Sequence, residues 1–165
     1  IKLLATSRKV GDQYYAMVSP VMIDAKNPLY SVNGVFNAIF IHGNVLGDAM
    51  FYGSGAGKLP TASAVVADVV DCAKNKGRNI MMSWSEEKLD LLQIDDVKSR
   101  FFVRVSGHAA ERQSEIEELF GKVEIVAVPS LSEEFAFITG EITEQEYREK
   151  AEKLDGIQSR IRARI

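Results

Sequence analysis

Residues 100–107 read RFFVRVSG, and they open the part of the chain whose pattern decides the fold. Apolar and polar residues alternate here, as in a strand with one buried face. A helical pattern follows, then two strand-like runs, a second helix and a final alternating run, IQSRIRARI. The resulting order, β-α-β-β-α-β, is that of ferredoxin-like domains. The sequence therefore predicts a ferredoxin-like domain over residues 99–165.

Two features of this tail predict local structure. Thr143 is followed three residues later by Glu146, the pair that forms a capping box at the start of a helix. In the final run, arginines alternate with apolar residues, which is typical of the solvated face of an edge or central strand. As an edge strand it would offer unpaired backbone groups to a second copy of the chain, so we expect a homo-oligomer.

The first part of the chain has a different pattern. Four strand-like runs precede residue 56, and a helix is expected from about Pro60 to Lys74. These runs suit an antiparallel or mixed sheet. Residues 78–98 mix charges with isolated apolar residues and are interpreted as a connector. The sequence thus predicts an α+β protein in three segments, namely residues 1–77, 78–98 and 99–165.

Composition excludes several classes of protein. The net charge of −3 over 165 residues gives no sign of the basic patch that nucleic-acid binding requires. No apolar run approaches the roughly 20 residues that cross a bilayer. The single cysteine, Cys72, indicates a reducing compartment, so a cytoplasmic location is expected. Neither His42 nor His108 has partners at ligand spacing, so no metal site is expected.

Residues 53–65, GSGAGKLPTASAV, raise the question of a phosphate or cofactor site. A P-loop requires Ser or Thr after Gly-Lys, but Leu59 stands there, and the spacing G-x-G-x-x-G is absent as well. The glycines still let the backbone approach another group closely, and a helix N-terminus attracts anions. The residues alone leave two interpretations open: a plain strand-to-helix turn, or a turn that contacts a ligand.

The stretch from Asn27 to Asp71, NPLYSVNGVFNAIFIHGNVLGDAMFYGSGAGKLPTASAVVADVVD, closely resembles homoserine dehydrogenase. In that family the substrate domain ends with an N-P-L-x-x-V-x-G-V-F-N-A-I-like strand. A turn and helix of the form G-x-G-A-G-x-x-P-T-A-S-A-V follow. The tail also looks like the ACT regulatory domain of many bacterial members. The resemblance implies the mixed or antiparallel sheet of the catalytic domain, followed by an ACT-type domain.

This resemblance implies an NAD(P)H-dependent reduction of L-aspartate 4-semialdehyde to L-homoserine, in threonine, methionine and isoleucine biosynthesis. The cofactor would be NADP or NAD. The Rossmann domain and the catalytic lysine motif of the family are not in this chain, and Lys2 does not match that lysine. We therefore expect a C-terminal fragment that is inactive alone and holds no catalytic residue.

The family's pattern also assigns the turn. By resemblance, the backbone of Gly57 approaches the dinucleotide, and Gly55 and Ala56 are further cofactor-binding candidates. ACT domains that bind amino acids usually carry an Asp-Arg-Pro-Gly-like turn after the first strand. Residues 106–110 read SGHAA instead, which argues against an amino-acid effector and favours a structural or oligomerising tail. The alternative function is a stand-alone ACT-type module for amino-acid sensing or oligomerisation.

Overall fold

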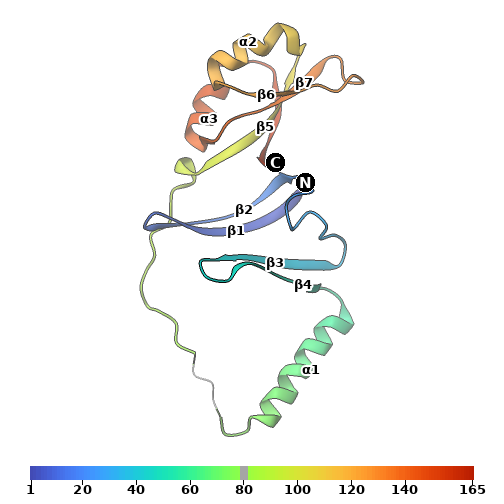
Figure 1. The fold of residues 1–165 in the computed structure, drawn as a ribbon, viewed down its shortest axis with the longest axis vertical. Coiled ribbons are helices and arrows are strands. Elements are labelled where there is room, and N and C mark those ends of the chain that lie inside the picture. Colours follow the sequence, from blue (N-terminus) through green and yellow to red (C-terminus); the bar gives the residue numbers. More distant parts are fainter. Residues whose placement is uncertain (79–81) are drawn as a thin grey trace. The chain divides into compact units, whose positions relative to one another are not determined.

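The computed structural model describes residues 1–78 and 82–165, so residues 79–81 of the predicted connector lie outside the described residues. The chain is a mixed α+β protein with two compact units (Figure 1). The first unit consists of residues 1–27 together with 88–165, and the second of residues 28–87.

The first unit is built on a mixed sheet. Its strands are β1 (Lys2–Val10), β2 (Gln13–Ile23), β5 (Lys98–Ser106), β6 (Glu124–Val126), β7 (Glu134–Ile138), β8 (Ile142–Thr143) and β9 (Ile157–Arg164). The order across the sheet is β1-β2-β9-β5-β7-β6, and the short β8, which the sequence does not predict, pairs with the start of β5. The pairs are antiparallel except for β2 with β9, which is parallel.

Two helices, α2 (Ala109–Phe120) and α3 (Glu144–Ala151), supply the other half of the core, and a short 3-10 helix, η1 (Ile94–Asp96), precedes β5. The twofold period of β5 turns one set of its side chains toward the helices. The resulting cluster contains aromatic and branched residues from both layers, namely Phe101, Val103, Val105, Ile116, Phe120, Phe135, Phe137, Tyr147 and Leu154. Gly121 ends α2 with a φ of 77°, which favours glycine.

The compact units do not coincide with the predicted segments, because β2 pairs with the end of the chain. Val21–Ile23 lie beside Arg162–Arg164, so the first 27 residues join the tail in one sheet. The final strand is therefore not the free edge strand that the expected pairing with a second copy requires. β5 flanks it on one side and β2 flanks its last residues on the other, while β1 and β6 form the edges of the sheet. Pro20, which has no N–H to donate, directly precedes the three residues of β2 that pair with β9.

The second unit holds a hairpin and a helix. Strands β3 (Phe36–Gly43) and β4 (Gly47–Ser54) pair antiparallel around the predicted Gly43-Asn44 turn, and α1 (Lys58–Lys74) follows. The sequence predicts close packing of the small, apolar face of this helix. Within the described residues, however, no residue of α1 is buried.

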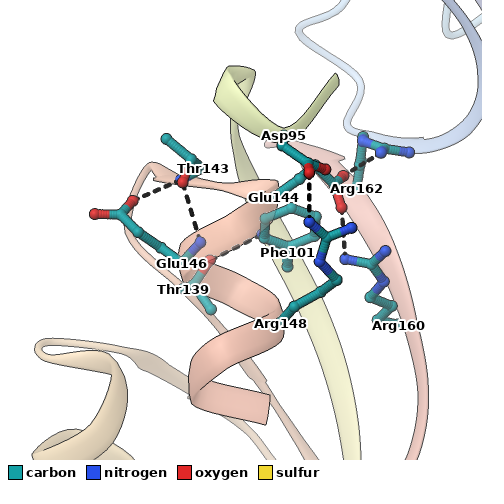
Figure 2. A network of polar contacts seen from close by, with 9 residues as sticks. All are labelled: Asp95, Phe101, Thr139, Thr143, Glu144, Glu146, Arg148, Arg160 and Arg162. Atoms are coloured by element: carbon teal, nitrogen blue, oxygen red, sulfur yellow. Dashed lines mark hydrogen bonds and ion pairs between the residues drawn. The ribbon is translucent and has the colours of Figure 1, made fainter. Parts of the chain in front are cut away.

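Two of the three arginines of β9 do more than face solvent, because they form ion pairs with a buried carboxylate. Arg160 and Arg162 both reach the carboxylate of Glu144, the first residue of α3, whose side chain is only 5% exposed (Figure 2). Arg160 Nη1 lies 2.8 Å from Glu144 Oε2. The guanidinium carbon of Arg160 also lies 4.5 Å from the ring centroid of Tyr147, a cation–π contact. One buried carboxylate thus joins the last strand to the last helix.

Replacing Glu144 with Gln should destabilise the protein strongly, because two guanidinium groups would lose their shared counter-charge. We expect the free energy of unfolding to fall by about 3 kcal/mol. Arg148→Gln is the matched control, since it breaks an ion pair with Asp95 whose side chains are 53% and 42% exposed. This control should cost less than about 1 kcal/mol. Urea unfolding compares the two variants, and equal losses would contradict a special role for Glu144.

The capping box predicted at α3 is present. The Glu146 N–H donates to Thr143 Oγ1 at 3.1 Å, and the Thr143 N–H donates to Glu146 Oε2 at 2.7 Å (Figure 2). The second of these bonds lowers the pKa of the Glu146 carboxyl below its ordinary value. A lowered pKa means that the folded state favours the ionised form. The stabilisation is therefore complete above the unfolded-state pKa and is lost as the pH falls through the folded-state pKa.

We expect the stability advantage of the wild type over Glu146→Gln to shrink as the pH falls through this acidic range. Urea unfolding at neutral pH and at a series of acidic pH values measures that difference. Thr143→Ser keeps both bonds of the capping box and should retain the pH dependence of the wild type. A difference between wild type and Glu146→Gln that stays constant with pH would refute this explanation.

Candidate functional site

The three residues predicted to bind a cofactor form one short turn in the second unit. Gly55, Ala56 and Gly57 connect the end of β4 at Ser54 to the first residue of α1, Lys58. All three are exposed. The hairpin holds the start of the turn and the helix holds its end, so both ends are anchored in regular structure.

Gly57 is a glycine because of its backbone conformation. It is the N-cap residue of α1 with φ 112° and ψ 162°, a region that residues with side chains rarely adopt. Its carbonyl accepts the N–H of Thr61 at 3.2 Å, the first bond of the helix. An added Cβ would meet only Pro60 Cδ, at 3.7 Å. Conformation rather than lack of space therefore requires glycine here, and the backbone of Gly57 stays open to a ligand.

The start of α1 suits an anionic group. The first N–H groups of a helix have no partner within it and carry partial positive charge. In the described structure no side chain caps this end, and no acidic residue occupies the first turn. Lys58 adds a positive charge at the first helical position, and Pro60 has no N–H to leave unpaired. The residues present therefore fit a phosphate-containing cofactor.

Gly55 is a glycine for a different reason. A Cβ built on it would lie 2.4 Å from Asn37 Nδ2, which is closer than such atoms approach in real structures. Gly53, two residues earlier, has nothing within 4 Å of an added Cβ. Ala56 is exposed, and nothing in the described geometry explains a specific role for its methyl group. The turn thus contains two glycines with separate constraints.

Sequence reasoning did not place Asn37 at this turn. The register of the hairpin could have found it, because folding Phe36–Gly43 back on Gly47–Ser54 sets Asn37 opposite Gly53. At the other end of the hairpin, His42 and Asp48 form an exposed pair. His42 Nδ1 lies 2.5 Å from Asp48 Oδ1. Within residues 1–78 and 82–165, no three His, Cys, Asp or Glu residues are arranged to hold a metal ion.

At the loop after β5, the side chain of Arg112 forms hydrogen bonds with backbone carbonyl groups. Gly107 adopts a φ of 100°, a conformation that favours glycine. The guanidinium of Arg112 donates to the carbonyl of Ser106 at 3.0 Å and to that of Asp155 at 2.9 Å. These carbonyl groups are therefore satisfied within the chain.

Among the helices of the described residues, none is long and apolar enough to cross a membrane.

Comparison with known proteins identifies the family. Residues 1–70 match the family model for homoserine dehydrogenase, and this range includes the whole Gly55–Gly57 turn. Homoserine dehydrogenase of Lactococcus lactis is 39% identical over 108 residues, which cover 64% of this chain and 25% of that protein. Residues 1–70 of this chain therefore belong to the homoserine dehydrogenase family. The Corynebacterium glutamicum homoserine dehydrogenase is 48% identical over 81 residues, covering 46% of the chain and 18% of its own length.

Solved structures extend the match beyond residue 70. A homoserine dehydrogenase from Thiobacillus denitrificans aligns over 99% of this chain with a TM-score of 0.77 and 25% identity. The alignment covers 42% of that protein. A Staphylococcus aureus homoserine dehydrogenase shares the fold, with a TM-score of 0.72 and 24% identity. The chain spans about a quarter of the length of the first curated relatives.

Proposed function

We propose that this chain is the part of an NAD(P)-dependent homoserine dehydrogenase that presents a turn to the cofactor. The complete enzyme would reduce L-aspartate 4-semialdehyde to L-homoserine, a step toward threonine, methionine and isoleucine. The observation that carries the proposal is the conformation of Gly57, which opens its backbone at a helix N-terminus within the family-matched residues. Whether the cofactor is NADP or NAD depends on residues that recognise the ribose, which belong to a dinucleotide domain.

The chain's own residues would bind and orient the cofactor. When bound, the nicotinamide cofactor supplies or accepts the hydride. Gly57 would let the dinucleotide come close to the main chain, because it has no side chain in the way. The N–H groups at the start of α1 and the charge of Lys58 would attract the negative diphosphate. We assign no catalytic residue to this chain.

We also propose the family's division of the chain: a catalytic part at residues 1–77, a connector at 78–98 and an ACT-type domain at 99–165. The order β5, α2, β6, β7, α3, β9 supports the last of these. A homo-oligomer, expected from the alternating final strand, and a cytoplasmic location, expected from the single cysteine, remain predictions. An independent amino-acid-sensing module is not favoured, because the SGHAA loop lacks the usual effector turn and Arg112 already binds the carbonyl of Ser106 in it.

Residues 1–165 alone should not catalyse the reaction. Hydride transfer requires that cofactor and substrate be held together, and we expect neither the dinucleotide domain nor the lysine motif of the family within residues 1–165. Purified protein assayed with homoserine and either NAD or NADP should show the background rate. Turnover that scales with the protein concentration would contradict this expectation.

In the complete enzyme, Gly57→Val should weaken cofactor binding by about tenfold or more, since the branched side chain would stand where the dinucleotide approaches. Gly77→Val is a matched control at the other end of α1. That glycine also has a positive φ, 76°, with nothing within 4 Å of an added Cβ. Both variants should lose similar stability by thermal unfolding, but only Gly57→Val should raise the Kd for the cofactor. Equal Kd values in wild type and Gly57→Val would remove the turn from the site.

A further inference from the structure

We infer that Asn37 is a positioning residue for the cofactor turn. Its side-chain amide lies against Gly55 and sets the path of the backbone into Gly57. This inference rests on the proposed function, because it concerns the same turn. It adds a residue that lies outside the turn itself, on the neighbouring strand β3.

The register of the hairpin explains how Asn37 reaches the turn. Asn37 lies directly opposite Gly53 in the antiparallel pair of β3 and β4. Gly55 comes two residues later, so it is the diagonal neighbour of Asn37 on the same face. Side chains at such diagonal positions lie within reach of each other. The amide therefore contacts the chain just after β4 ends at Ser54, where the ladder no longer holds it.

The Asn37 side chain is the group nearest to the space beside the Gly55 Cα. A Cβ on Gly55 would stand 2.4 Å from Asn37 Nδ2, 3.1 Å from its Cγ and 3.4 Å from its Cβ. Any side chain at position 55 must therefore displace the amide or move the turn. At position 55 the group nearest to an added Cβ is the amide of the exposed Asn37, whereas at Gly57 the constraint is set by the backbone dihedral angles.

The consequence concerns the cofactor. Gly55 is only two residues from Gly57, so a shift at the first is transmitted to the second through a single intervening residue. Binding groups must be held to within about 0.5 Å to act well. Asn37 would thus tune cofactor affinity without touching the cofactor, and without a large share in the stability of the fold.

The first test needs no cofactor. In residues 1–165, Asn37→Ala should shift the backbone amide NMR signals of Gly55, Ala56 and Gly57. Ile39→Ala is the matched control, because Ile39 is the next residue on the same face of β3, is 65% exposed and lies opposite Phe51. The control should leave the three signals unchanged. Signals that do not move in Asn37→Ala, or that move equally in both variants, would overturn the inference.

The second test uses the complete enzyme. Gly55→Ala should raise the cofactor KM about tenfold, with kcat changing much less, and Gly53→Ala should behave as wild type. Asn37→Ala should raise the cofactor KM about threefold at an unchanged melting temperature. The double variant Asn37→Ala/Gly55→Ala should resemble Asn37→Ala, since removing the amide makes room for the new methyl group. Additive effects in the double variant would overturn the inference.

The inference and the proposed function can fail separately. If Gly57→Val weakens cofactor binding while Asn37→Ala leaves the cofactor KM unchanged, Asn37 is not a positioning residue and the proposed function stands. If Gly57→Val leaves cofactor binding unchanged, the turn does not face the cofactor. In that case, a change in the cofactor KM in Asn37→Ala could not act through Gly57, and the inference falls with the proposed function.

Discussion

The parallel pairing of β2 with β9 determines how the rest of the first unit is organised. Three residue pairs, from Val21 to Ile23, bring the beginning of the chain beside its end. With β5 on its other side, β9 is flanked by strands at this point and its side chains face α3. The side chains of Arg160 and Arg162 are only partly exposed, at 37% and 21%, so pairing their charges with a carboxylate is favourable. Glu144 supplies that pairing for both Arg160 and Arg162.

Much of this fold could be predicted from local sequence, because its elements have local causes. The alternation in β5, the Thr143–Glu146 capping box and the Gly43-Asn44 hairpin turn each depend on neighbouring residues. The pairing of β2 with β9 joins residues about 140 positions apart and has no local signal. For the same reason, local sequence predicts only a solvated face for the arginines of β9. Their partner, Glu144, becomes evident only when α3 packs beside the strand.

The candidate site was predictable in one respect and not in another. The resemblance to homoserine dehydrogenase pointed to the turn at Gly55–Gly57, and the family model covers it. The resemblance did not show that the two glycines of the turn differ. Gly57 has a positive φ, whereas Gly55 lies beside the amide of Asn37. The first constraint belongs to a single residue, but the second depends on the register of two strands. A glycine count cannot separate them, and the structure does.

We propose that the Gly57 backbone faces the nicotinamide cofactor of the complete enzyme. The most direct measurement is a crystal structure of the complete enzyme with NADP or NAD bound. The account predicts dinucleotide atoms in van der Waals contact with the Gly57 main chain, at about 4 Å, and the Asn37 amide still against Gly55. A dinucleotide bound elsewhere, with the Gly55–Gly57 turn facing solvent or another part of the protein, would contradict it.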